Sequence, residues 1–148
     1  MQKTTVRVKK LRNAAALPEY GSPGAAGADL RACIEEERAI EPGETAMIPT
    51  GLAFEIPPGY VGLVFARSGL STKRGLAPAN KVGVIDSDYR GEVFVPLYNH
   101  SGARQTVAPG ERVAQLLIVP VAACDFVESE SLGDTQRRDG GFGSTGRL

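Results

Sequence analysis

Apolar and polar residues alternate with a period of two in several short stretches of the chain. The clearest are residues 5–9, parts of residues 45–56 and parts of residues 91–98. Successive side chains of a β-strand point to opposite faces, so this alternation is typical of strands with one buried face. Longer apolar runs at residues 60–65 and 113–119 indicate strands that are covered on both faces. The pattern therefore predicts a protein built mainly from short strands.

Glycine and proline leave little room for long helices. The chain of 148 residues has 18 glycines and 10 prolines, and both residue types interrupt helical patterns. Turn signals at residues 41–44, 57–59 and 108–111 separate the apolar runs at the spacing of a sandwich or barrel. The predicted fold class is all-β, with a single β domain at residues 1–127.

One short helix is expected. It begins near Ser68 and runs to about Arg74, and Gly75 follows where a C-terminal cap would sit. A serine that caps the helix is the commonplace interpretation of Ser68. The alternative is a phosphate site, because the first backbone N–H groups of a helix and its dipole attract anions.

The last part of the chain, residues 128–148, differs in composition from the rest. Its strongly apolar residues are only Leu132, Phe142 and Leu148, too few to offset the entropy of ordering the backbone. A frayed terminus is one interpretation. The other is a flexible arm that closes over a nucleotide, since the glycine-rich residues 140–146 follow Arg137 and Arg138 and combine backbone donors, hydroxyls, cations and one aromatic ring.

Charge and cysteine content exclude several classes of protein. Seventeen basic residues balance seventeen acidic ones, so no global field attracts nucleic acid or an anionic membrane. The longest apolar stretch, residues 113–124, is shorter than the ~18 residues of a membrane span. Cys33 and Cys124 have no CxxC partner, which favours reduced thiols over a disulfide or zinc site. Without an export signal at the start, a cytoplasmic location is expected.

The segment of residues 80–92, NKVGVIDSDYRGE, contains the strongest candidate for catalysis. It holds Asp86 and Asp88 inside an otherwise apolar pattern, but Arg90 stands where a calcium loop needs another oxygen ligand. A solvated hairpin turn is the simpler interpretation. The alternative is that Asp86, after the apolar residues Val84 and Ile85, acts as a base on a water molecule.

Five motifs, taken together in order, resemble those of the trimeric deoxyuridine triphosphatases (dUTPases). They are AGADL at 26–30, ARSGL at 66–70, GVIDSDYRGE at 83–92, GERVAQL at 110–116 and RRDGGFGSTG at 137–146. The resemblance covers nearly the whole chain. It implies a jelly-roll-like (β-clip) fold, a homotrimer with active sites shared between subunits, and hydrolysis of dUTP to dUMP and pyrophosphate with Mg²⁺.

The resemblance also implies roles for individual residues. Asp86 is expected to activate the water that attacks the α-phosphorus, and Asp29 to hold Mg²⁺ through water. The residues implied in phosphate binding are Arg67, Ser68, Gly69 and Gln115. Those implied in recognition of the base and sugar are Asn80, Val84, Ile85 and Tyr89. The arm is expected to supply Arg137, Phe142, Gly143, Ser144 and Thr145, with Phe142 stacking on uracil.

Two positions depart from the family pattern. Ala66 stands where the family usually has proline, and Arg138 where the arm usually has glycine. The strongest rival is a deaminase of dCTP, or a bifunctional deaminase and dUTPase, which shares the fold but is expected to lack the complete glycine-rich arm. A catalytically silent nucleotide-binding regulator is the non-enzymatic alternative. Stable binding of nucleic acid or of a membrane is not expected.

Overall fold

The fold is described from a computed structural model, for residues 4–139. These residues form twelve strands and one helix. In chain order the elements are β1 (Arg7–Lys10), β2 (Glu19–Tyr20), β3 (Ala28–Arg31), β4 (Arg38–Ile40), β5 (Thr45–Pro49), β6 (Leu52–Glu55), β7 (Tyr60–Phe65), α1 (Ser68–Arg74), β8 (Leu76–Pro78), β9 (Gly83–Ile85), β10 (Phe94–Asn99), β11 (Gln105–Val107) and β12 (Arg112–Pro120).

The largest sheet has five strands, in the order β2-β3-β12-β7-β9. All four pairings in it are antiparallel. The long strand β12 lies at its centre, where Gln115 is opposite both Asp29 of β3 and Phe65 of β7. Strand β9 is an edge strand that pairs with β7 alone. The sheet thus brings the first and fourth motifs onto the adjacent strands β3 and β12, while the second motif follows β7 and the third begins on β9.

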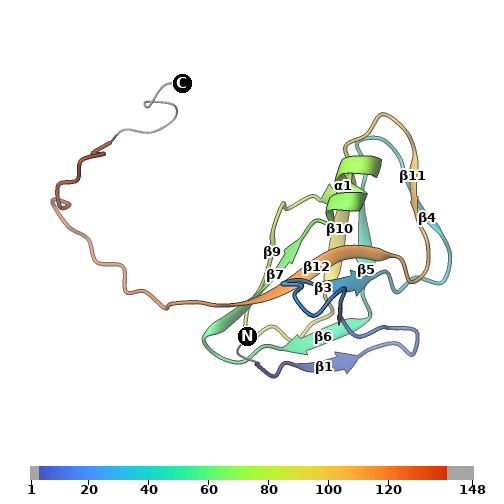
Figure 1. Ribbon diagram of the computed structural model, residues 1–148, viewed down its shortest axis with the longest axis horizontal. Coiled ribbons are helices and arrows are strands. Elements are labelled where there is room, and N and C mark those ends of the chain that lie inside the picture. Colours follow the sequence, from blue (N-terminus) through green and yellow to red (C-terminus); the bar gives the residue numbers. More distant parts are fainter. Residues whose placement is uncertain (1–3, 140–148) are drawn as a thin grey trace.

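Smaller sheets complete the body. Strands β5, β10 and β8 form one of them, and β1–β6 and β11–β4 form two-stranded pairs. Alternate residues of β5 and β10 are buried, among them Ile48, Val95 and Leu97. These side chains join Leu30 and Val113 of the large sheet in one apolar core. The alternation predicted for parts of residues 45–56 and 91–98 is therefore confirmed in β5 and β10, whereas three consecutive residues of β6 are buried. The body is all-β (Figure 1).

The predicted helix is confirmed from Ser68 to Arg74, but Ser68 is not its N-terminal cap. The N-terminal cap is Arg67, without a capping side chain, and Ser68 is the first helical residue. At the other end Gly75 has φ 68° and donates its N–H to the carbonyl of Leu70. A Cβ at Gly75 would lie 2.7 Å from the Cβ of Ser101, so glycine is required here for both its conformation and its size.

Strands β7 and β12 were expected to be covered on both faces. In the single chain this is wrong, because residues of both strands are partly exposed. In β7 only Gly62 and Val64 are fully buried. One face of each strand packs on the core, and the other face stays open within this chain.

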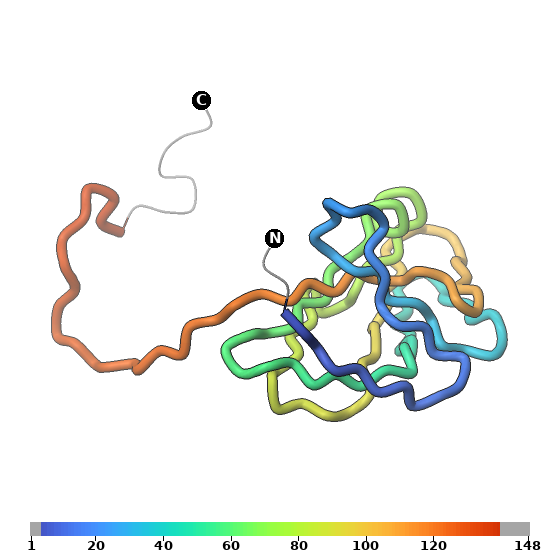
Figure 2. Tube along the Cα trace, turned by 60° about the horizontal axis from the view of Figure 1, so that its bottom comes forward, coloured from blue at the N-terminus to red at the C-terminus, as the bar shows by residue number. Residues whose placement is uncertain are grey.

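After β12 the chain leaves the body. Residues 121–139 contain no helix or strand and are exposed throughout, and they extend away from the sheets (Figures 1 and 2). Cys124 in this segment is exposed, whereas Cys33 in the body is buried, and neither forms a disulfide. Within residues 4–139, no helix is both long and apolar enough to cross a membrane.

Candidate functional site

A pocket of about 320 Å³ lies beside the edge strand β9. It brings together the predicted base, sugar and catalytic residues. Its lining includes Asn80, Gly83, Val84, Ile85, Asp86, Tyr89 and Glu92. The sequence analysis had assigned five of these residues to one site, and the fold places all five around the same pocket.

The chain makes a tight turn at residues 78–82, directly before β9. Lys81 has φ 64°, its N–H donates to the carbonyl of Pro78 at 3.0 Å, and the N–H of Val82 donates to the carbonyl of Asn80 at 2.7 Å. A Cβ at Gly83 would lie 3.2 Å from the Cβ of Val64 and 3.4 Å from Nδ2 of Asn80. The absent side chain of Gly83 therefore lets the Asn80 amide lie close against the strand.

Asp86 stands at the end of β9, and the N–H of Tyr89 donates to its carbonyl at 3.2 Å. Its carboxylate is exposed in the single chain and has no hydrogen bond or ion pair within residues 4–139. The expectation of apolar surroundings is met only in part, because the pocket contains Val64 and Ile85 but the carboxylate itself faces solvent. An unpaired carboxylate at a pocket edge is available to accept a proton from water.

Two arginines bind the buried carboxylate of Asp29, and of these only Arg67 is a predicted site residue. Nε of Arg67 donates to Oδ1 at 2.9 Å, and Nη1 of Arg112 donates to Oδ2 at 3.1 Å. The Asp29 side chain is 8% exposed. Two guanidinium groups on one buried carboxylate leave a net positive charge, and both cations are held in fixed positions. This arrangement can bind an anion such as phosphate.

The sequence analysis did not identify Arg112, although it lies in the motif GERVAQL. Its role becomes visible only once β3 is paired with β12, because Arg112 and Gln115 both lie on the strand beside Asp29. Gln115 is half-buried, and a Cβ at Gly27 would lie 3.1 Å from its Cβ. The glycine of the first motif therefore makes room for the side chain of the fourth.

The start of α1 adds backbone donors to this group. The first helical hydrogen bond is from the N–H of Ser71 to the carbonyl of Arg67, so the amides of Ser68 and Gly69 precede the helical ladder. Both residues are exposed, and Gly69 has open space where a side chain would be. Ser68 and Gly69 thus face solvent at the start of α1, next to the partly buried Arg67.

The two groups of residues are far apart in one chain. Val64 of β7 is opposite Gly83 of β9, and the strands are antiparallel. Arg67 lies three residues beyond Val64, and Asp86 lies three residues beyond Gly83 in the opposite direction. At about 3.3 Å per residue the two positions are roughly 20 Å apart along the strands. A single chain therefore cannot bring both to one phosphate.

The arm is described only to Asp139. Arg137 is exposed, and Arg138 has φ 47° with its N–H donating to the carbonyl of Thr135 at 3.2 Å. That left-handed conformation is one that glycine adopts more easily than arginine. The predicted residues Phe142, Gly143, Ser144 and Thr145 lie outside the described residues.

Comparison with known proteins identifies the family. The family model described as dUTPase matches residues 13–146. The chain belongs to the dUTPase family. A deoxyuridine 5'-triphosphate nucleotidohydrolase of Desulfitobacterium hafniense is 53% identical over 131 residues, which cover 88% of this chain and 87% of that protein.

Solved dUTPases of bacteriophages have the same fold. A point mutant of the dUTPase of Staphylococcus bacteriophage 80alpha, with dUpNHpp, has a TM-score of 0.85 and 31% identity over 97% of this chain and 99% of its own. A mutant dUTPase of phage phi11 of S. aureus, described with a structural Mg(II) ion, has a TM-score of 0.78 and 29% identity over 86% of this chain and 98% of its own. The predicted jelly-roll-like, all-β architecture is confirmed.

The part of the chain that the structure describes offers little to hold a metal by protein groups alone. No group of three or more His, Cys, Asp or Glu side chains is placed to bind an ion among residues 4–139. A hard cation such as Mg²⁺ often takes only one or two carboxylates and completes its shell with water and substrate phosphates. A single buried carboxylate near a phosphate site fits that pattern.

Proposed function

We propose that this chain hydrolyses dUTP to dUMP and pyrophosphate, as a dUTP diphosphatase of the family to which it belongs. The reaction limits the uracil that enters DNA and supplies dUMP for thymidylate synthesis. The observation that carries the proposal is the pocket at β9, which joins an unpaired carboxylate, an exposed edge strand and a half-exposed tyrosine.

Asp86 is the general base of this reaction. It takes a proton from a water molecule, whose oxygen attacks the α-phosphorus as the bond to the bridging oxygen of pyrophosphate breaks. Phosphoryl transfer of this kind depends mostly on positioning and on charge neutralisation. The free carboxylate at the pocket edge supports the role, because no group in the described chain competes for its oxygens.

Uracil recognition follows from the edge position of β9. The outer side of an edge strand presents backbone N–H and C=O groups without a partner, and uracil carries both donors and acceptors on its pairing edge. Val84 and Ile85 supply this backbone, and the amide of Asn80 beside Gly83 completes the hydrogen bonds. Tyr89 packs on the deoxyribose and leaves no room for a 2′-hydroxyl group.

The triphosphate is bound by the group of residues around Asp29. Arg67 and Gln115 provide a cation and an amide, and the amides of Ser68 and Gly69 provide backbone donors. The arm closes from another subunit, with Arg137, Gly143, Ser144 and Thr145 on the phosphates and Phe142 on uracil. Closure excludes water from the reacting groups.

Mg²⁺ is the cofactor that we propose, and Asp29 would hold it through water beside the bound triphosphate. The ion would supply positive charge against the charge that develops on the phosphate oxygens. Within this chain Asp29 has a second task, since its two oxygens orient Arg67 and Arg112. A water-mediated contact is compatible with both tasks, whereas direct ligation would take an oxygen from one arginine.

We propose a homotrimer with active sites shared between subunits, which is the assembly that the resemblance to the dUTPases implies. The separation of roughly 20 Å between Asp86 and Arg67 along the strands of one chain supports the sharing of each site between copies. The body at residues 1–127 forms the trimer, and residues 128–148 act as the flexible arm. A cytoplasmic location and the lack of stable contacts with nucleic acid or membranes remain predictions of the sequence.

The experiment that tests the function measures pyrophosphate release from dUTP, dCTP, dTTP and UTP in parallel, with ammonia monitored in each reaction. Pyrophosphate from dUTP alone, without ammonia, supports a dUTP diphosphatase. Ammonia from dCTP would instead identify the deaminase, and nucleotide binding without turnover would identify the silent regulator.

A further inference from the structure

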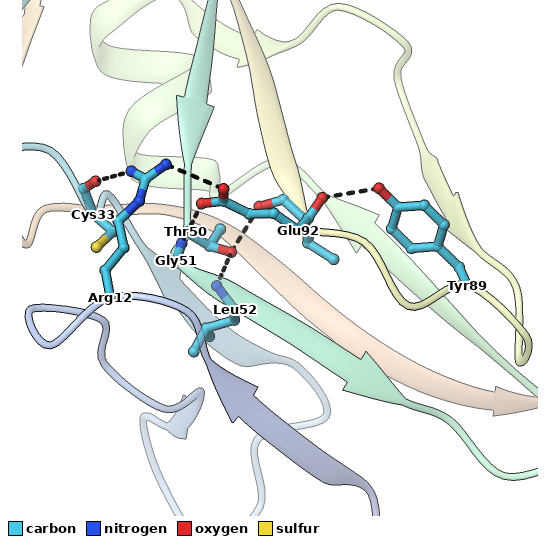
Figure 3. A network of polar contacts seen from close by, with 8 residues as sticks. Arg12, Cys33, Thr50, Gly51, Leu52, Tyr89 and Glu92 are labelled. Atoms are coloured by element: carbon cyan, nitrogen blue, oxygen red, sulfur yellow. Dashed lines mark hydrogen bonds and ion pairs between the residues drawn. The ribbon is translucent and has the colours of Figure 1, made fainter.

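The ring of Tyr89 is held in place by the two residues that end its loop. Its hydroxyl donates to the backbone carbonyl of Glu92 at 3.0 Å (Figure 3). A Cβ at Gly91 would lie 2.4 Å from the Tyr89 hydroxyl oxygen and 2.6 Å from Cζ. The ring therefore lies directly over Gly91, and its direction depends on where the backbone of residues 91 and 92 is fixed.

The side chain of Glu92 points away from Tyr89 and into the body (Figure 3). One carboxylate oxygen accepts the N–H of Gly51 at 2.8 Å, and the other accepts Nη2 of Arg12 at 3.1 Å. Nη1 of Arg12 donates in turn to the carbonyl of Cys33 at 3.1 Å. The Glu92 side chain is 14% exposed, so both oxygens are engaged in a site with limited access to water.

The next residue is tied to the same segment of the body. The carbonyl of Val93 accepts both the N–H and the hydroxyl of Thr50, at 3.2 and 2.7 Å, and its N–H donates to the carbonyl of Leu52 at 2.9 Å. The other end of the loop is held by the pairing of β9 with β7. The loop that carries Asp86 and Tyr89 is thus anchored at both ends.

We propose that Glu92 is a positioning residue for sugar discrimination, acting through Tyr89. Its carboxylate fixes the backbone carbonyl that holds the Tyr89 hydroxyl, and so sets the ring against the C2′ face of the nucleotide. This inference rests on the proposed function, in which Tyr89 is the sugar filter. Without the anchor at Glu92, the Tyr89 ring would change its direction, and the pocket would admit a ribonucleotide more easily.

The test compares kcat/KM for dUTP and for UTP in Glu92→Ala, Glu92→Gln and a matched control, Glu44→Ala. Glu44 has the same bonding pattern outside the lining of the pocket, with one oxygen on Arg38 and the other on the N–H of Glu41, both at 2.9 Å. The control therefore removes an equivalent carboxylate without touching the loop.

We expect Glu92→Ala to lower the ratio of the two kcat/KM values by about tenfold or more, since a misplacement of about 1 Å can cost about 100-fold in rate. Glu92→Gln keeps an acceptor for the N–H of Gly51 and should recover part of the ratio. Glu44→Ala should leave the ratio unchanged. A ratio that is unchanged in Glu92→Ala, or that falls equally in Glu44→Ala, overturns the proposal.

Two further variants keep the test decisive if Glu92→Ala does not fold. Tyr89→Phe removes only the hydroxyl and should lower the ratio in the wild-type background but add little in Glu92→Gln, because the anchor is already weakened there. Additive effects in that pair also overturn the proposal. Tyr89→Ala tests the role of Tyr89 separately from that of Glu92. If this variant hydrolyses dUTP with an unchanged ratio, Tyr89 is not the sugar filter, and the roles of both residues are refuted. If the ratio falls in Tyr89→Ala but not in the Glu92 variants, only the role of Glu92 is refuted.

Discussion

Activity should return when two inactive variants are combined in one trimer, because the proposed site takes Asp86 from one chain and Arg67 from another. The variants are Asp86→Asn and Arg67→Gln. The second is chosen because Asp29 keeps its partner Arg112 at 3.1 Å, so the buried carboxylate is not left alone.

The expected recovery follows from the arrangement. In randomly mixed trimers made from equal amounts of the two variants, each site needs an intact Asp86 from one chain and an intact Arg67 from its neighbour. Each condition is met half of the time, so about one quarter of the sites should be complete in a closed threefold ring. Each variant alone should retain about one hundredth of the normal rate or less.

The assay is pyrophosphate release from dUTP after the two variants have been unfolded and refolded together. Wild-type protein taken through the same procedure sets the full rate, and each variant refolded alone sets the background. Recovery near one quarter supports shared sites. A mixture no more active than the average of its parents would refute the reasoning from the β7–β9 register, provided that differently tagged chains copurify and so prove the exchange.

Three other outcomes are expected. Asp86→Asn should slow turnover by at least ~100-fold while keeping the affinity for dUTP. Pre-steady-state kinetics can check the rate, and equilibrium binding of dUTP before it is hydrolysed can check the affinity. Near-normal turnover would show that Asp86 is not the general base. Deleting residues 137–148 should leave the thermal unfolding midpoint unchanged and abolish most activity, and a truncated chain that unfolds would show the arm to be structural. Gly75→Ala should lower the free energy of unfolding by about 1 to 3 kcal/mol, because φ is 68° and Ser101 occupies the space of the new Cβ; thermal denaturation showing no loss would contradict this.

Local patterns were sufficient for much of the secondary structure, and the resemblance of the motifs to the dUTPases was sufficient for the residues of the base pocket. The helix at Ser68–Arg74 was predicted with its boundaries because glycine at position 75 meets a local conformational need. Asn80, Asp86 and Tyr89 line one pocket partly because they are close in sequence, although Met47, Val64 and Phe94 from distant strands complete its wall. Short-range geometry is readable from residue types and their spacing.

Contacts between distant segments were not readable in this way. Nothing in the motif GERVAQL indicates that Arg112 shares the carboxylate of Asp29 with Arg67. No role for Glu92 was predicted from the sequence, yet Arg12 and Gly51 both donate to its carboxylate. These partners are set by strand order and register, which depend on how the whole core packs.

By itself, the sequence determined the all-β class, the short helix, the family and the residue types that the chemistry requires, because each of these depends on local periodicity, turns or a set of motifs. Only the tertiary structure decided which side chains meet. It placed Asp86 and Arg67 at opposite ends of an antiparallel ladder and Glu92 behind the ring of Tyr89. The physical reason is that strand register is a property of the packed sheets, in which residues far apart along the chain bury their apolar faces together.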